Sequence, residues 1–338
     1  MFLEDEEIDY SIVICTYNPD ERILERCLDA VAKFDLDNLK IEVILVDNNS
    51  KIKVKDLPFI KKYTEVIRSI NILHVAQQGV QHARIEAIKK SRGKYIVYID
   101  YDNEPSADYL QQLAILNKQY PQVAAWGPGH VSVDFIDGIS TEIENYARAA
   151  LQERHEQQLF FADAEEWQPC YPFGTGLCTY SSILKEYVTL AELGKFTLPG
   201  REGNKLTSGE DTQMVLLCIS KGYSAGVSPT LKLKHVIPGS RTSKQYFKRL
   251  AYGTGISYET CMLQVFPQQE KRLQQTIMPA GKFARKAVKK FIRAKLSFKP
   301  FKTFELVSFI ASNAGVYVAL GKPLPPIVEK MIKYLHVD

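Results

Sequence analysis

Continuous apolar runs dominate the first hundred residues of the chain. They lie at 10–17, 41–47, 70–75 and 94–100, and each has the length of a strand. A strand that is apolar throughout, and not only at alternate positions, is typical of a sheet covered on both faces. We therefore predict four buried strands in this part of the chain.

Helical spacing fills the intervals between these runs. In 22–34 the apolar side chains recur three and four residues apart, and 79–93 repeats this pattern up to Gly93. Neighbouring strands joined through helices run parallel. The pattern predicts an α/β chain with a mostly parallel sheet flanked by helices, and such sheets bind ligands beyond the carboxyl ends of their strands.

Polar residues gather at three of these strand ends, which read Thr16-Tyr17-Asn18, Asp47-Asn48-Asn49 and Asp100-Tyr101-Asp102. We expect all three ends to open onto one crevice. Asp100 and Asp102 are separated by one residue at a strand-to-turn bend, so both carboxylates can face one divalent cation. The alternative is a solvated turn, which Asp and Asn also favour.

Two common nucleotide-binding motifs are missing from the sequence. No GxGxxG follows the first strand, and GxxxxGK[ST] occurs nowhere. A phosphate-bearing ligand at this sheet would therefore need another source of positive charge, which a metal held by the two aspartates supplies.

A second acidic pair lies at the start of a helix in the second half of the chain. The segment 200–223 reads as a Gly-rich loop followed by a helix, with Ser208 as its expected N-cap. Glu210 and Asp211 then occupy the first turn, where the helix dipole favours carboxylates. That stabilising role is the alternative to a chemical one.

The composition is that of an ordinary globular protein. Of 338 residues, 45% are hydrophobic and 24% charged, and the net charge of +4 gives no global field for nucleic acid. The six cysteines form no CxxC pair, which favours reduced thiols. The N-terminus lacks the pattern of a signal peptide, and no apolar run reaches eighteen residues. We expect a cytoplasmic protein.

Positive charge is concentrated near the C-terminus. Residues 271–302 carry eleven Lys or Arg and no acid, and 280–302 has an apolar stripe at helical spacing opposite its basic positions. This pattern favours peripheral binding to an anionic membrane surface at the inner face of the cell membrane. A basic helix docked on the rest of the protein is the alternative, and nucleic acid is not expected.

Five segments together resemble the family 2 glycosyltransferases, which have the GT-A fold. They are SIVICTYNP, VILVDNNS, QQGVQHARIEAIKKSRGKYIVYIDYDNEP, SGEDTQM and HVIPGSRTSKQYFKRLAYGTG, in that order between residues 10 and 255. The resemblance implies a catalytic domain over 1–255. The remaining residues, 256–338, are expected to form a helical, basic appendage.

The resemblance also implies roles for individual residues. The donor nucleotide would contact Thr16, Tyr17, Asn18, Asp47, Asn49, Gly79, Arg84, Asp100, Tyr101 and Arg241. Asp100, Asp102 and His235 would hold Mn²⁺ or Mg²⁺. Asp211, beside Glu210, would be the general base that deprotonates an acceptor hydroxyl, and one displacement inverts the anomeric carbon.

The expected activity is transfer of a sugar from a nucleotide-diphosphate sugar, with a UDP-sugar favoured. The acceptor would be a hydroxyl of a glycan or lipid-linked molecule in surface polysaccharide or glycolipid synthesis. A sugar nucleotidyltransferase is an alternative, although TYNPDER lacks the Gly-rich loop that class carries after its first strand. A sugar-nucleotide-binding protein without catalysis is another. The donor sugar, the acceptor, the linkage and the oligomeric state stay open.

Overall fold

The structure is a computed structural model that describes residues 7–67, 69–198, 200–201, 206–297 and 299–338. The described residues form two compact units, each with its own core. The first unit takes its residues from Met1–Asp134, Gln152–Phe196 and Met214–Val236. The second takes them from Phe135–Leu151, Thr197–Gln213 and Ile237–Asp338. This division differs from one boundary at residue 255, because two earlier segments belong to the second unit and its last segment already starts at Ile237.

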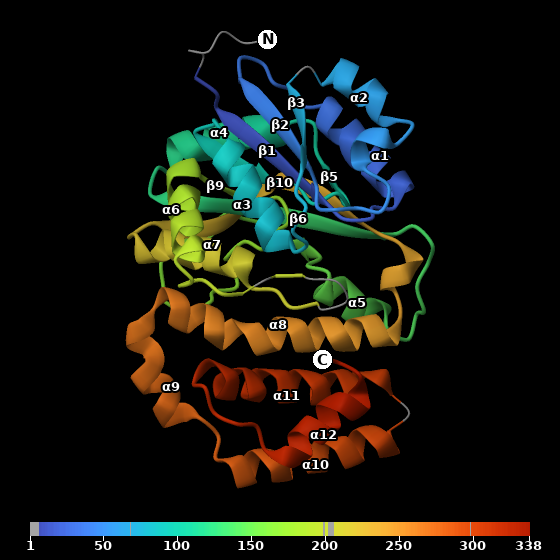
Figure 1. Cartoon of the computed structure of the whole chain (residues 1–338), viewed down its shortest axis with the longest axis vertical. Helices are drawn as coiled ribbons and strands as arrows, with labels where there is room; N and C mark the ends of the chain where they lie inside the picture. The colour runs from blue at the N-terminus through green and yellow to red at the C-terminus, as the bar shows by residue number, and fades with distance from the viewer. Residues whose placement is uncertain (1–6, 68, 199, 202–205, 298) are drawn as a thin grey trace. The chain divides into compact units, whose positions relative to one another are not determined.

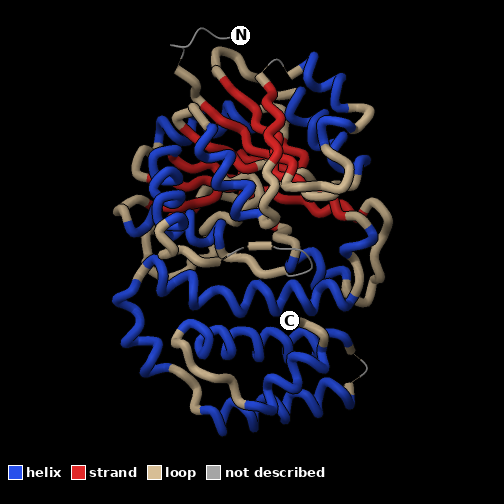
Figure 2. Tube along the Cα trace, in the orientation of Figure 1, coloured by secondary structure: helices blue, strands red, loops and turns tan. Residues whose placement is uncertain are grey.

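The strands belong to one ten-stranded sheet, shown in red in Figure 2. They are β1 (Tyr10–Thr16), β2 (Ile41–Asp47), β3 (Ile70–His74), β4 (Tyr95–Tyr98), β5 (Asn103–Pro105), β6 (Val123–Phe135), β7 (Arg154–His155), β8 (Phe160–Ala162), β9 (Cys178–Tyr180) and β10 (Ser224–Ile237). The order along the sheet is β3-β2-β1-β4-β9-β6-β10-β5, with β7 beside β6 and β8 beside β10.

The helices, drawn as coiled ribbons in Figure 1, separate the early strands and make up most of the C-terminal part. They are α1 (Glu21–Ala32), α2 (Ile60–Val66), α3 (Val80–Lys90), α4 (Tyr109–Gln119), α5 (Glu144–Ala150), α6 (Ser181–Glu192), α7 (Glu210–Ser220), α8 (Lys244–Val265), α9 (Glu270–Thr276), α10 (Ala280–Leu296), α11 (Pro300–Ala319) and α12 (Pro326–Leu335). Short 3₁₀ turns lie at η1 (Val54–Asp56), η2 (Gly239–Arg241) and η3 (Pro267–Gln269).

The α/β prediction is confirmed, and the predicted strands and helices lie within a few residues of the observed ones. The sheet is mixed, however, and not mostly parallel. Strands β3, β2, β1 and β4 pair in parallel through helical crossovers. Strand β9 then pairs antiparallel with both β4 and β6, and β10 pairs antiparallel with β5 and β8. The irregular sequence after residue 121 gave no sign of these pairings.

The core of the first unit explains why its strands are apolar throughout. Alternate side chains of β1, such as Ile12 and Ile14, pack in one cluster with Leu24 and Leu28 of α1. Helix α3 contacts β1, β2 and α6, and its buried side chains lie outside that cluster. The parallel strands are therefore covered on both faces, as the pattern predicts.

The second unit has a separate helical core. Helix α11 packs along α8, and α10 packs against α11 and α12. Buried side chains from these helices, including Phe283, Ala287, Ile310 and Ile332, form one cluster. The apolar stripe of α10 is thus used within this unit, while its lysines and arginines lie mostly exposed.

Gly93 provides a test of how closely the loop between α3 and β4 approaches β1. A Cβ atom at Gly93 would lie 2.5 Å from the backbone nitrogen of Ser11 and 2.7 Å from the carbonyl carbon of Tyr10. Because backbone atoms cannot move aside as a side chain would, we expect Gly93→Ala to lower the free energy of unfolding by about 1–3 kcal/mol.

Urea unfolding followed by circular dichroism measures this change, with Gly281→Ala as the control. A Cβ at Gly281 meets nothing within 4 Å and lies in a helix, so that variant should be unchanged or up to about 1 kcal/mol more stable. Equal stability of the two variants would contradict the close approach.

Candidate functional site at the carboxyl ends of the parallel strands

The ends of β1 and β2 are joined by hydrogen bonds between their loops. The Asn18 backbone N–H donates to Ser50 Oγ at 2.9 Å, and the Lys51 N–H donates to Asn18 Oδ1 at 2.8 Å. Asn18 and Asn49 have positive φ angles of 44° and 62°, a conformation that Asn tolerates better than most residues. Two of the three predicted strand ends therefore lie together.

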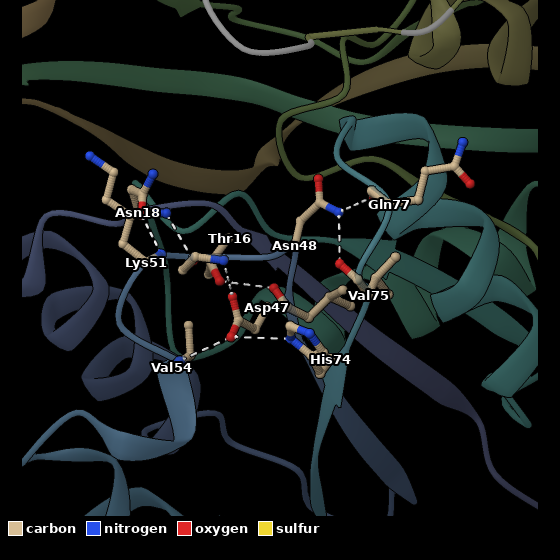
Figure 3. A network of polar contacts seen from close by, with 11 residues as sticks. Thr16, Asn18, Asp47, Asn48, Lys51, Val54, His74, Val75 and Gln77 are labelled. Carbon is tan, nitrogen blue, oxygen red and sulfur yellow. Dashed lines mark hydrogen bonds and ion pairs between the residues drawn. The ribbon is translucent and has the colours of Figure 1, made fainter.

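Asp47 holds the loop after β2 in place. Its Oδ1 accepts from the Ser50 N–H at 2.9 Å, and its Oδ2 accepts from the Val54 N–H at 3.2 Å (Figure 3). The Nδ1 atom of His74, at the end of β3, lies 3.6 Å from the same Oδ2. Asp47 is only 2% exposed, and both of its oxygens stabilise the loop. The predicted contact with the donor base would use the remaining lone pairs.

Asn48 connects this loop to the start of α3, and sequence reasoning gave it no role. Its Nδ2 donates to the carbonyl oxygens of Val75 and Gln77, at 3.3 and 2.7 Å (Figure 3). Its Oδ1 accepts from the N–H of Gly79 at 2.8 Å. Gly79 has a φ of 127°, which favours glycine, and α3 begins directly after it.

Helix α3 then brings Arg84 to the third strand end. Arg84 is 4% exposed, and its guanidinium lies over the ring of Tyr98 at 4.9 Å from the centroid. Its Nη2 lies 3.7 Å from Asp100 Oδ1. The ends of β2 and β4 are thus linked through Asn48, Gly79 and Arg84, as the prediction of one crevice requires.

The aspartate pair lies in a tight bend between β4 and β5. The Asp100 N–H donates to Asn103 Oδ1 at 3.1 Å, the Asn103 N–H donates to the Asp100 carbonyl at 2.9 Å, and Asn103 Nδ2 donates to Asp102 Oδ1 at 3.1 Å. Thr175 Oγ1 lies 3.5 Å from Asp100 Oδ2. The sequence analysis assigned no role to Asn103 or Thr175. Asn103 directly follows Asp102 and could have been found from that position, whereas Thr175 is 75 residues from Asp100.

The two aspartates differ in environment. The Asp102 side chain is 5% exposed, whereas that of Asp100 is 38% exposed. Between them, Tyr101 packs its ring against the apolar cluster that includes α1. Burial, followed by the charges of Asp102 and Asp100, raises the pKa of the Cys27 thiol well above its usual value. Cys27 is therefore a neutral, buried neighbour of the pair.

Strand β10 places His235 beside Asp102. His235 is opposite Asn103 in the antiparallel register, and its Nε2 lies 3.6 Å from Asp102 Oδ2. The Val236 N–H donates to the Asp102 carbonyl at 2.8 Å, which fixes the register. Two of the predicted metal-site residues, His235 in β10 and Asp102 in the bend before β5, are thus neighbours.

Three further predicted residues, Glu210, Asp211 and Arg241, are found in the second unit. Glu210 and Asp211 form the first turn of α7, and Asp211 Oδ1 accepts from the N–H of Thr212 at 2.8 Å. The helix begins at Glu210, so Gly209 and not Ser208 has the N-cap position. Arg241 lies in the 3₁₀ turn η2. The roles of Glu210, Asp211 and Arg241 stay predictions.

Residues on either side of the acidic pair of α7 form hydrogen bonds with α8. Cys261 Sγ lies 3.5 Å from the Gly209 carbonyl, and Gln264 Oε1 accepts from Gln213 Nε2 at 2.5 Å. Burial, together with the charges of Asp211 and Glu210, raises the pKa of the Cys261 thiol. Gly209 has a φ of 138°, and a Cβ there would meet Leu198 Cδ1 at 2.7 Å.

Comparison with known proteins assigns the first unit's site to a family. Residues 11–171 match the family model described as Glycosyl transferase family 2. Residues 11–171 of this chain belong to glycosyl transferase family 2. The predicted resemblance is confirmed, and the matched stretch of this family 2 domain contains the ends of β1 and β2, Arg84 and the aspartate pair. Asp211, His235 and Arg241 lie beyond it.

Individual relatives have low sequence identity to this chain. An N-acetylglucosaminyltransferase of Sinorhizobium fredii is 24% identical over 231 residues, which are 68% of this chain and 53% of the relative. The glycosyltransferase AglE of Haloferax volcanii is 31% identical over 103 residues, which are 30% of this chain and 33% of AglE. The chain thus matches about half the length of the first of these, and a third of the second.

A solved structure of similar size is the mannosyltransferase PcManGT from Pyrobaculum calidifontis, in complex with GDP-Man and Mn²⁺. It is 16% identical, has a TM-score of 0.49, and the match covers 98% of this chain and 81% of that one.

Asn48 allows a test of the link between β2 and α3. In Asn48→Asp the two donated hydrogen bonds are lost, and a carboxylate oxygen faces two carbonyl oxygens. Leaving buried partners unsatisfied costs about 1–3 kcal/mol, so we expect a loss of stability of that size in urea unfolding. Asn49→Gly is the matched control, because Asn49 is exposed at positive φ. If Asn48→Asp were as stable as this control, the link would be unimportant.

Proposed function

We propose that the chain is an inverting, metal-assisted glycosyltransferase. It transfers a sugar from a nucleotide-diphosphate sugar to a hydroxyl group of a glycan or lipid-linked acceptor in surface polysaccharide or glycolipid synthesis. The observation that carries the proposal is the linked site at the ends of β1, β2 and β4, within residues that belong to family 2. We take 1–255 as the catalytic region and 256–338 as the helical appendage.

The donor set of the aspartate pair fits a hard cation. Asp100 and Asp102 offer carboxylate oxygens, and His235 offers an imidazole nitrogen close to Asp102. No three His, Cys, Asp or Glu side chains form a metal cluster in the part of the chain that the structure describes. Mg²⁺ in particular is commonly held by one or two carboxylates plus substrate phosphates and water, so two aspartates suffice.

In this proposal, Asp100 and Asp102 hold the cation, with His235 as a further ligand or a hydrogen-bond partner of Asp102. When bound, Mn²⁺ or Mg²⁺ neutralises the diphosphate and stabilises it as a leaving group. Arg84 adds a fixed positive charge at the same place, because its guanidinium is buried beside Asp100. The loops after β1 and β2, with Asn18 and Asp47, hold the nucleoside.

Asp211 is the general base of this proposal. Its carboxylate takes the proton of the acceptor hydroxyl while that oxygen attacks the anomeric carbon and the diphosphate leaves. Its place in the first turn of α7 supports the role, because the hydrogen bond from the Thr212 N–H fixes the orientation of the carboxylate. Glu210, 5% exposed at the start of α7, positions this turn.

A UDP-sugar is the proposed donor, and the names of the relatives select one to test first. Several curated relatives that align with about two thirds of this chain are N-acetylglucosaminyltransferases. We therefore propose UDP-N-acetylglucosamine as the first donor.

Residues 280–302 are proposed to bring the enzyme to an anionic membrane surface. Most lysines and arginines of α10 are exposed, while its apolar stripe packs within the second unit. Binding would therefore be mainly electrostatic and would weaken as salt is raised. Among the helices in the described ranges, none has both the length and the apolar character needed to cross a bilayer. We place the enzyme in the cytoplasm, peripheral at the inner face of the membrane.

The metal role is tested with Asp102→Asn. We expect UDP to bind the wild-type chain about tenfold or more tightly with Mn²⁺ than without it, because the cation joins the carboxylates to the diphosphate. The variant should lose that gain. Calorimetric titration measures both, and Asp37→Asn is the control because Asp37 is exposed at a positive φ that Asn also tolerates. A metal-dependent gain that survives in Asp102→Asn would reject the assignment.

The base is tested with Asp211→Asn. Removing the base should lower the rate of sugar transfer from UDP-N-acetylglucosamine by about 10²–10⁴-fold and leave UDP affinity unchanged. Product formation with a panel of glycan and lipid-linked acceptors provides the rate. UDP binding without any transfer in the wild-type chain would favour a sugar-nucleotide-binding protein instead.

A further inference from the structure

A basic cavity lies within the second unit, apart from the residues proposed for catalysis. Its volume is about 260 Å³, and its lining residues come from the start of α8, the end of the α10 segment and the start of α11. The lining residues are Lys244, Lys248, Ser297, Lys299, Pro300, Thr303 and Phe304. Three of the seven are lysines, two carry hydroxyl groups and none is acidic.

Both helices present hydrogen-bond donors to this cavity. Lys244 and Lys248 are one turn apart on α8, so their side chains share a face. Helix α11 begins at Pro300, next to Lys299, and Thr303 is in its first turn. The first N–H groups of a helix have no intrahelical partner, and the helix dipole favours an anion there.

The charges of the cavity are only partly neutralised. Lys244 Nζ lies 2.6 Å from Glu142 Oε2. Lys248 Nζ donates to the Leu335 carbonyl at 3.3 Å, and neither Lys248 nor Lys299 has a carboxylate partner among the described residues. Burial and the nearby charge of Lys295 lower the pKa of Lys248. The positive charges therefore repel one another, and an anion would relieve that repulsion.

The volume and the lining of the cavity limit the size and the chemical group of a ligand. Phe304 is 2% exposed and is stacked on Tyr146 with ring centroids 4.1 Å apart, which gives a rigid wall. The volume lies just below the range of about 300–1,000 Å³ that suits drug-sized ligands. Ammonium and hydroxyl donors from several directions match the three or four oxygens of a phosphate better than a planar carboxylate.

We propose that this cavity binds a phosphate group carried by a small polar head. The phosphate can belong to a lipid or to a free metabolite. The last two turns of α10 and the first turn of α11 also expose apolar side chains, with Ile292, Leu296 and Phe301 exposed by 52%, 77% and 54%. Exposed apolar residues beside lysines are typical of segments that enter the interface of a membrane, which favours the lipid source.

The test compares two kinds of vesicle and two pairs of substitutions. Flotation measures binding to phosphatidylcholine vesicles that contain either phosphatidic acid or phosphatidylserine at equal surface charge. The double variant Lys248→Gln/Lys299→Gln removes two charges from the cavity. The matched control, Lys286→Gln/Lys289→Gln, removes two charges from the exposed face of α10. Calorimetric titration with glycerol phosphate tests the free source.

We expect the wild-type chain to prefer phosphatidic acid about tenfold, which is the contribution of one charge-assisted hydrogen bond. The cavity variant should lose this preference, whereas the control should bind both vesicles more weakly and keep it. Binding of glycerol phosphate without a vesicle preference would support the cavity with a soluble ligand.

Absence of both effects, or equal losses in the two double variants, would overturn the proposal. Lys299→Glu serves as a second cavity variant, because Lys299 is exposed and its replacement leaves the helical core intact. The measurement is of binding alone, so it stands or fails independently of sugar transfer.

Discussion

The first unit depends on hydrogen bonding of the backbone where the parallel strands end. Beyond the sheet, N–H and C=O groups lose their strand partners, and buried ones need new partners. Side chains with short amide or carboxylate groups provide them here: Asp47 for two N–H groups, Asn48 for two carbonyls and one N–H, and Asn103 for the bend that holds the aspartates. The same polar residues that could bind a nucleotide are therefore those that hold the loops.

Buried charge follows from this arrangement. Helix α3 starts directly after Gly79, and its first turns place Arg84 at the end of β4, where the guanidinium lies beside Tyr98 and Asp100. A buried arginine requires a nearby carboxylate or π-face. Asp100 thus has a structural partner already, and in the proposed reaction a diphosphate with its cation would join an existing arrangement of opposite charges. In the proposed reaction, side chains already held in position would reduce the cost of binding.

The second unit handles charge in a different way. Its helices bury one apolar cluster and leave their cationic side chains on the surface or around the cavity at the start of α11. The membrane and phosphate proposals therefore rest on charge and exposed apolar residues, whereas the transferase proposal rests on a buried polar network. These are separate physical properties of one chain, and each can be changed without the other.

By itself, the sequence determined the parallel part of the fold. Fully apolar strands that alternate with helices form a parallel sheet covered on both faces, and few other folds fit that pattern. The sequence also located the aspartates that follow β4 and the acidic pair that starts α7. The resemblance to the family was likewise visible in the sequence. Only the tertiary structure decided that the sheet continues with antiparallel strands, since those pairings join residues far apart in sequence. The same holds for Asn48 and Thr175, whose partners are long-range, and for the lysines of the cavity. Lys248 and Lys299 are 51 residues apart, and only the packing of α8 beside α11 brings them to one cavity.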